Sequence, residues 1–208
     1  MRISHDRMAS PKPKPTMKER ILETADRLFY LRGIRAIGVD TIAAEIGISK
    51  RTLYNHFPSK DALISAYLER RFVQPRDSDK SPVEQILGTF DSLERRFASK
   101  DFRGCPFVNA VAEVGPENRS VRKIAVAFKE SRRLWFRDLL VQIGVADPEG
   151  LATQLVLLVD GSIAQDLVRD DPAMARAAKE AAKMLLSGAG AKLDEPTSAS
   201  RRKDRAKE

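Results

Sequence analysis

The chain has 208 residues, of which 42% are hydrophobic and 32% are charged, an ordinary globular composition. Charges interrupt the apolar runs too often for a membrane span, and the first residues lack the apolar core of a signal peptide. A single cysteine and two histidines cannot form an internal disulfide or a usual zinc site. We therefore expect a cytoplasmic protein with no metal, no cofactor and no membrane association.

Positive charge is concentrated near the N-terminus. The formal net charge is +8, and residues 1–74 hold 14 Lys or Arg against 8 Asp or Glu, whereas residues 75–208 hold 23 against 21. Clustered positive charge suits a module that binds a polyanion, because neutralised phosphates release condensed counterions. A solvated surface with basic tails gives the same charge, so charge alone leaves both interpretations open.

The two ends of the chain have the composition of tails. Pro11, Pro13 and Pro15 alternate with lysines, which predicts a flexible basic arm over residues 1–15. Residues 190–208 mix serine, proline and basic residues without apolar periodicity, which predicts a disordered tail.

The sequence between the tails predicts about nine helices and no sheet, so the expected fold class is all-α. Thr16 and Glu19 form a capping box for the first helix, which ends at Gly33. Ser81 and Glu84 form a second capping box. Further helices are expected from Ser59, over residues 106–114 and about 120–143, and from Pro148 and Pro172.

Residues 38–57 have the landmarks of a helix-turn-helix. Ala43 is small where two helices cross, and Gly47 permits the positive φ that ends the first helix. Ser49 is placed to cap the second helix, and Leu53 anchors that helix to the core. An ordinary helical hairpin shares these landmarks, but the exposed side of the second helix carries DNA-contacting chemistry in Lys50, Arg51, Thr52, Tyr54, Asn55 and His56.

Residues 41–63 resemble the DNA-binding region of the tetracycline-repressor (TetR) family, above all in the run Leu53-Tyr-Asn-His-Phe57 followed by Ser59-Lys-Asp-Ala-Leu63. The resemblance implies a helix-turn-helix domain over residues 16–74 and a helical effector-binding and dimerisation domain over 75–189. It also implies a dimeric repressor that binds a palindromic operator and is released from this DNA by a small molecule. One departure is Gly38, where many relatives have a Ser or Thr cap, but glycine is an acceptable N-cap.

The resemblance also carries roles onto single positions. Contacts to phosphate, which orient the protein on double-stranded DNA, are expected from Thr41, Ser49, Tyr54, His56 and Lys60. Contacts to base edges are expected from Arg51, Thr52 and Asn55, because arginine pairs with guanine and asparagine with adenine. Lys50 lies beside them on the same exposed helix.

The C-terminal part offers candidates for an effector site. Phe90, Phe107, Asn109 and Trp135 are expected to face a pocket for an apolar or aromatic effector, although each also fits an ordinary core. Cys105 starts a short helix beside Arg103, and both the helix dipole and the arginine favour a thiolate. Cys105 is therefore either a redox or electrophile sensor or a buried apolar thiol.

A homodimer is expected through the last two helices, whose small or apolar residues allow close packing, namely Leu155, Leu158, Ala173, Ala177 and Ala181. Two alternatives remain open. The first is a constitutive DNA-binding scaffold or activator without an effector. The second is a helical enzyme with Cys105 or Ser162 as nucleophile, for which the sequence offers no histidine base outside the DNA motif and the N-terminal arm.

Overall fold

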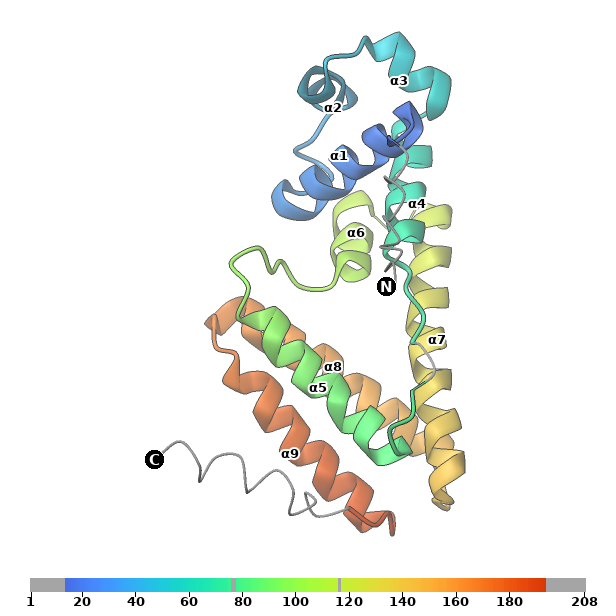
Figure 1. The fold of residues 1–208 in the computed structure, drawn as a ribbon, viewed down its shortest axis with the longest axis vertical. Helices are drawn as coiled ribbons and strands as arrows, with labels where there is room; N and C mark the ends of the chain where they lie inside the picture. Colours follow the sequence, from blue (N-terminus) through green and yellow to red (C-terminus); the bar gives the residue numbers. More distant parts are fainter. Residues whose placement is uncertain (1–13, 76–77, 116, 194–208) are drawn as a thin grey trace, which may run out of the picture. The chain divides into compact units, whose positions relative to one another are not determined.

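The computed structural model describes residues 14–75, 78–115 and 117–193. Within these ranges the chain is all-α, with nine helices and no strand (Figure 1). The all-α prediction is therefore confirmed. The helices are α1 (Met17–Arg32), α2 (Val39–Ile46), α3 (Lys50–His56), α4 (Lys60–Arg71), α5 (Pro82–Phe97), α6 (Pro106–Val114), α7 (Arg119–Ile143), α8 (Pro148–Arg169) and α9 (Ala173–Gly188).

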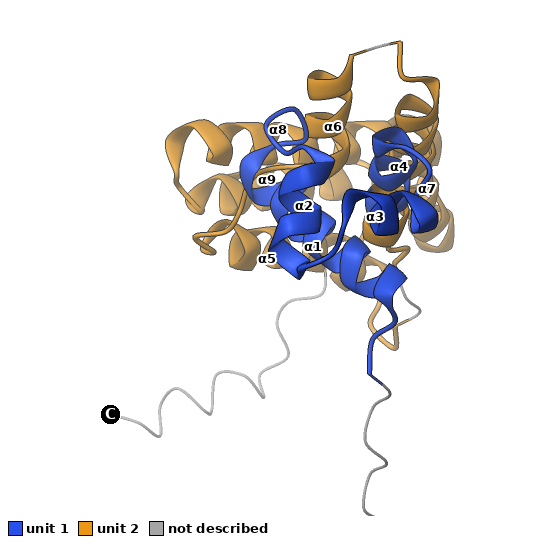
Figure 2. Ribbon diagram, turned by 90° about the horizontal axis from the view of Figure 1, so that it is seen from above, with its two compact units in different colours: residues 1–67 blue, residues 68–208 orange. Residues whose placement is uncertain are grey.

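The chain divides into two compact units, Met1–Tyr67 and Leu68–Glu208 (Figure 2). The division falls inside α4, whereas the sequence suggested a boundary after residue 74. Packing explains the difference, because the ring of Tyr67 lies edge-on to Phe29 in the first unit with centroids 5.7 Å apart. The residues just after Tyr67 already belong to the second unit.

The first unit is built on local capping signals and a small apolar core. The capping box predicted at the start of α1 is present, with the backbone N–H of Glu19 donating to Thr16 Oγ1 over 3.2 Å. Ser59 caps α4 by accepting from the backbone N–H of Ala62 over 3.0 Å. The fully buried side chains of this unit include Ile21, Ala25, Ile42, Leu53 and Leu63.

The core of the second unit lies among α5, α7, α8 and α9, and α6 packs on α7. In Figure 1, α5, α8 and α9 run side by side. The predicted capping box of α5 is present between Ser81 and Glu84. Phe136 is fully buried on α7, whereas its neighbour Trp135, which the sequence singled out, is only half-buried.

Three phenylalanines form an aromatic cluster in the second unit. Phe107 on α6 stacks against Phe128 on α7 with centroids 3.8 Å apart. Phe72, the first residue after α4, lies edge-on to Phe128 at 5.6 Å and to Phe107 at 6.3 Å. The cluster therefore ties the end of α4 to α6 and α7.

The C-terminal packing extends further than the sequence suggested. The predicted tail begins at residue 190, but Ala191 is only 7% exposed and Leu193 packs against the core. Residues 1–13 of the predicted N-terminal arm and residues 194–208 of the predicted tail lie outside the described residues.

Helix α8 is the one helix among the described residues that is long and apolar enough to cross a membrane by length and composition alone. A third of that stretch is buried inside the second unit, where α8 packs against α7 and α9. Its apolar character is thus partly explained by the helical core.

Candidate nucleic-acid interface and ligand pocket

The turn between α2 and α3 has the geometry that its sequence predicts. Gly47 takes the left-handed conformation, with φ at 71°, which a side chain would strain. The backbone N–H of Ile48 then donates to the carbonyl of Ala43 over 3.0 Å and closes the turn. Ile42, Ala43 and Leu53 are buried, so α2 and α3 are held at a fixed angle by their inner faces.

Ser49 caps α3, as the sequence indicated. Its hydroxyl accepts from the backbone N–H of Thr52 over 3.1 Å and lies 2.9 Å from the Thr52 hydroxyl. The Ser49 hydroxyl therefore satisfies one of the amides at the helix start that have no carbonyl partner within the helix. The cap fixes where α3 begins, and hence which of its side chains face outward.

The outer face of α3 presents a continuous polar surface. Its exposed residues are Lys50, Arg51, Tyr54, Asn55 and His56, and Thr52 is half-buried. Thr41, in the first turn of α2, is exposed as well. These side chains are long or hydrogen-bonding, and the apolar Leu53 and Phe57 between them point inward.

Lys50 is already engaged in an ion pair. Its ammonium lies 3.0 Å from Asp40 Oδ2, and this hydrogen bond and the charge of Asp40 raise the pKa of Lys50. Both side chains are more than half exposed, so water and salt screen the pair. Lys50 can exchange this partner for a phosphate.

Lys60 has a structural bond that its sequence does not reveal. Its ammonium donates to the backbone carbonyl of Ile34 over 2.6 Å, and the residue is half-buried. The bond connects α4 to the loop between α1 and α2. The sequence-based role of Lys60 as a phosphate contact is thus joined by a role in holding the first unit together.

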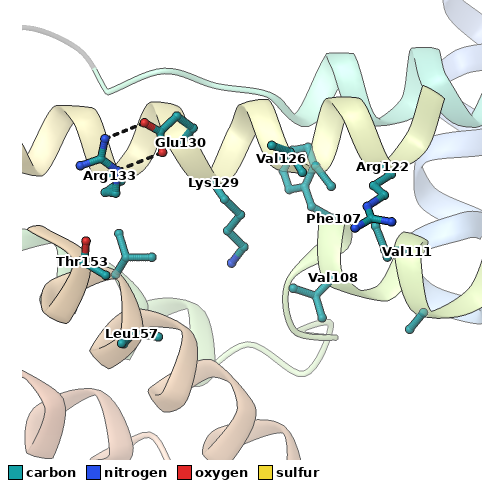
Figure 3. A pocket seen from close by; sticks show the side chains of 13 residues that line it. Phe107, Val108, Val111, Arg122, Val126, Lys129, Glu130, Arg133, Thr153 and Leu157 are labelled. Carbon is teal, nitrogen blue, oxygen red and sulfur yellow. Dashed lines mark hydrogen bonds and ion pairs between the residues drawn. The ribbon is translucent and has the colours of Figure 1, made fainter. Parts of the chain in front are cut away.

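An apolar cavity of about 590 Å³ lies among α6, α7 and α8 in the second unit (Figure 3). Its volume is in the range of small-molecule sites. In Figure 3, α7 runs along one side, and side chains from α6 and α8 meet it across the cavity. The apolar lining is Phe107, Val108, Val111, Ala112, Ala125, Val126, Val156 and Leu157.

Charged side chains from α7 border the same cavity. Arg133 pairs with Glu130 and with Glu149 of α8, and Lys129 pairs with Asp160 of α8. The pairs with Glu149 and Asp160 connect α7 to α8. Arg133 has its pKa raised by its hydrogen bonds to the two glutamates, so it stays charged.

The structure distributes the sequence-predicted ligand residues over several places. Phe107 lines the apolar cavity, whereas Phe90 is 1% exposed inside the core of the second unit. Asn109 donates to the carbonyl of Arg103 over 2.6 Å, and Trp135 lies half-buried against the core. Cys105 is 8% exposed and forms the N-cap of α6.

Sequence reasoning missed the side chains that make most of the cavity wall. Val126 and Leu157 line it and are 60% and 65% exposed. A lone valine or leucine carries no chemical signal, and their shared position depends on the packing of α7 against α8. Of the aromatic residues that drew attention in the sequence, only Phe107 lines the cavity, and Phe90 fills the core.

The predicted dimer residues also occupy different environments in one chain. Leu155 is fully buried in the core, and Leu158 packs partly against it. Ala177 is exposed, and Ala173 and Ala181 are half-buried. Only the three alanines of α9 and part of Leu158 are therefore accessible to a second copy.

The all-α fold and the polar outer face of α3 define a helix-turn-helix DNA-binding protein. The model of the family described as "Bacterial regulatory proteins, tetR family" matches residues 21–67. A TetR transcriptional regulator from Streptomyces avermitilis has a solved structure that is 31% identical, covers 86% of this chain and 100% of its own, and superposes with a TM-score of 0.76. A TetR-family regulator from Streptomyces coelicolor is 32% identical, covering 82% of this chain and 94% of its own with a TM-score of 0.73. The HTH-type transcriptional repressor KstR2 of Mycolicibacterium smegmatis is 29% identical over 157 residues, which are 66% of this chain and 69% of that protein. The chain belongs to the TetR family of transcriptional regulators.

Proposed function

We propose that the protein is a ligand-responsive repressor that binds a palindromic operator as a homodimer. Helix α3 reads the operator. A small apolar or aromatic effector that binds in the cavity among α6, α7 and α8 releases the protein from the operator. The observation that carries the effector part is the apolar cavity of about 590 Å³. The similarity to KstR2, which is named a repressor, supports repression as the outcome, and a DNA target supports a cytoplasmic location.

The aromatic cluster supports a route from the cavity toward α4. Phe107 lines the cavity, stacks on Phe128 and contacts Phe72 at the end of α4. A ligand that binds better when Phe107 is displaced favours a state in which Phe72 is displaced too. Since α4 begins in the unit that carries α2 and α3, this displacement reaches the DNA-binding unit along the chain.

The dimer is supported by apolar stripes on the outer faces of α8 and α9. At about 100° per residue, the exposed or half-buried Ala173, Ala177, Ala181 and Met184 fall on the face of α9 opposite its buried residues. On α8, a similar exposed stripe contains Gly161, Ala164 and Val168. Two such helices from each copy can form a four-helix interface.

Selection of duplexes from a random pool tests the DNA-binding part. We expect enrichment of a palindromic site with half-sites about one or two helical turns apart, bound about 1,000-fold more tightly than a scrambled duplex. An enriched site without twofold symmetry would contradict the proposed dimeric mode.

A thermal-shift screen of apolar and aromatic compounds, followed by titration of the protein–operator complex, tests the effector part. Val126→Trp should fill the cavity and abolish release by the hits, while binding to the operator stays intact. Val141→Trp is the matched control, because Val141 is 58% exposed on the same helix and does not line the cavity. Release that is unchanged in Val126→Trp would place the effector elsewhere, and a screen without hits would favour a constitutive regulator.

Modification of Cys105 is the alternative trigger. The thiol lies two residues before Phe107 at the start of α6, so an adduct there displaces the cavity wall. Release by a mild electrophile that is lost in Cys105→Ser would support this trigger. Release that persists in Cys105→Ser would exclude it.

A further inference from the structure

A second cavity, of about 550 Å³, lies in the second unit where α5 and α8 end. It shares no lining residue with the apolar cavity. Its wall combines the aromatic Phe97 and Phe102 with four charged residues, Lys100, Arg103, Asp166 and Asp170.

Asp166 is the unusual member of this wall. It is 4% exposed, and its Oδ1 atom has no hydrogen-bond partner among the described residues. A buried carboxylate oxygen without a donor destabilises the folded chain, because its hydration is lost and nothing replaces it. Burial raises the pKa of Asp166, and the neighbouring charges of Asp170 and Asp171 raise it further, whereas a hydrogen bond from the backbone of Asp171 to the carboxylate lowers it.

The surroundings of Asp166 favour a positive charge. Both α5 and α8 direct their C-terminal ends, and hence their partial negative charge, toward the cavity. Helix α9 starts nearby with the opposite polarity, but the backbone N–H of Ala173 is occupied by Asp171 Oδ1 at 2.9 Å. Lys100 is exposed, so its ammonium can remain in water.

The rest of the wall suits a compact apolar group. The rings of Phe97 and Phe102 lie 4.9 Å apart at a tilt of 48°. The guanidinium of Arg96 lies 5.6 Å from the centroid of the Phe102 ring, in a cation–π contact. Leu167 adds aliphatic surface beside Asp166.

We propose that this second cavity binds a small organic cation, an amine or amidine with a short aromatic or apolar body, whose N–H group donates to Asp166 Oδ1. The ligand supplies to Oδ1 of Asp166 the hydrogen-bond donor that the described residues of the chain do not provide. Binding here is separate from the effector cavity and does not depend on it.

Calorimetric titration with phenethylamine and benzamidine tests the proposal, with phenethyl alcohol and 3-phenylpropionate as neutral and anionic controls. We expect saturable binding of at least one cation and none of the controls. Asp166→Asn should weaken cation binding about tenfold or more, since a charge-assisted hydrogen bond is lost. Asp138→Asn, which removes the same charge from α7 outside the cavity, should leave binding unchanged.

Two further variants show which of the two cavities holds the cation. Leu167→Trp should fill the second cavity and abolish binding without touching the carboxylate, and Val126→Trp in the apolar cavity should have no effect. The proposal is overturned if neither cation binds the unmutated protein, if phenethyl alcohol binds as well as the cations, or if Asp166→Asn and Asp138→Asn behave alike.

Discussion

Arg51 and Lys60 illustrate two kinds of side chain at the proposed DNA surface. Arg51 is exposed in the first turn of α3, whereas Lys60 is half-buried and bonded to the carbonyl of Ile34. A side chain on the outer face of α3 can enter the major groove. Lys60 can contact a phosphate only by sharing its ammonium with the Ile34 carbonyl or by leaving it.

Arg51→Ala should cost about 1–3 kcal/mol on the selected operator, because a bidentate contact to a base is lost. The loss on a scrambled duplex should be smaller, and preference should relax at one base-pair position. Anisotropy titrations on both duplexes measure this. Equal losses on the two duplexes would leave Thr52 and Asn55 as the residues that read the sequence.

Lys60→Ala should combine two effects. Binding to all duplexes should weaken, with a salt dependence flatter by about one unit. The Tm should fall as well, because the Ile34 carbonyl loses its donor. Tyr54→Phe is the matched comparison, since it removes one exposed hydroxyl and should weaken binding with no change in salt slope or Tm.

The buried Asp166 predicts a pH-dependent gain in stability for Asp166→Asn. The folded-state pKa of Asp166 is raised above the ordinary aspartate value of about 3.9. Ionised Asp166 therefore destabilises the folded chain, fully at any pH above the raised pKa and progressively less as the pH falls toward the ordinary value. At neutral pH the amide should therefore raise the Tm, and the gain should vanish as the pH falls below the ordinary value. Asp170, Asp171, Lys100 and Arg103 are the charged neighbours. Thermal unfolding of both proteins between acidic and neutral pH checks the sign, and a gain that grows toward acid would contradict it.

The exposure and contacts of single residues were predictable only where they depend on the local sequence. The exposure of Arg51, Tyr54 and Asn55 follows from their helical positions relative to Leu53, so the sequence indicates it. The partner of Lys60 lies 26 residues away, and the burial of Asp166 depends on where α5 ends. Neither the hydrogen bond of Lys60 nor the burial of Asp166 can be inferred from the residues that neighbour them in the sequence.

At the scale of elements, the helix starts are the best predicted features. Both predicted capping boxes and the caps at Ser49 and Ser59 are present, and they were predictable because a cap joins residues only three apart. The long helix begins at Arg119, one residue before its predicted start. What the sequence does not provide is the angle at which α6, α7 and α8 meet, and this angle creates the apolar cavity.

The capping box of α5 makes an element-scale prediction. Ser81→Ala should lower the Tm by about 2–4 °C, because an N-cap of this kind is worth roughly 1 kcal/mol. Ser120→Ala is the control, since Ser120 is an exposed residue inside α7 and alanine favours a helix there. Calorimetry should show a decrease for the first variant and none for the second.

At the scale of the whole molecule, dimerisation and operator binding should fail together. In the proposed dimer each copy supplies one α3 helix, so a monomer would contact one half-site and lose most of its affinity. Ala177→Glu on α9 and Val168→Glu on α8, where Val168 is 85% exposed, should place charges in the proposed interface.

Sedimentation at micromolar concentration should show a dimer for the unmutated protein and a shift toward monomer for both variants. Val141→Glu, an equally large change at an exposed valine of α7, should remain dimeric and bind the operator. A monomeric unmutated protein would refute the interface, and dimeric variants would move it away from α8 and α9.

The ion pair between Lys50 and Asp40 has a consequence for how the protein searches DNA. The Asp40 carboxylate competes with a DNA phosphate for the Lys50 ammonium, and it competes equally on every duplex. Asp40 therefore shortens the residence time of the protein on nonspecific DNA, where contacts to bases add no affinity. Asp40→Asn should tighten binding to operator and scrambled duplexes alike, steepen the salt dependence by up to about one unit, and lengthen residence on nonspecific DNA. Unchanged affinity for the scrambled duplex would show that Lys50, once released from Asp40, makes no contact with phosphate.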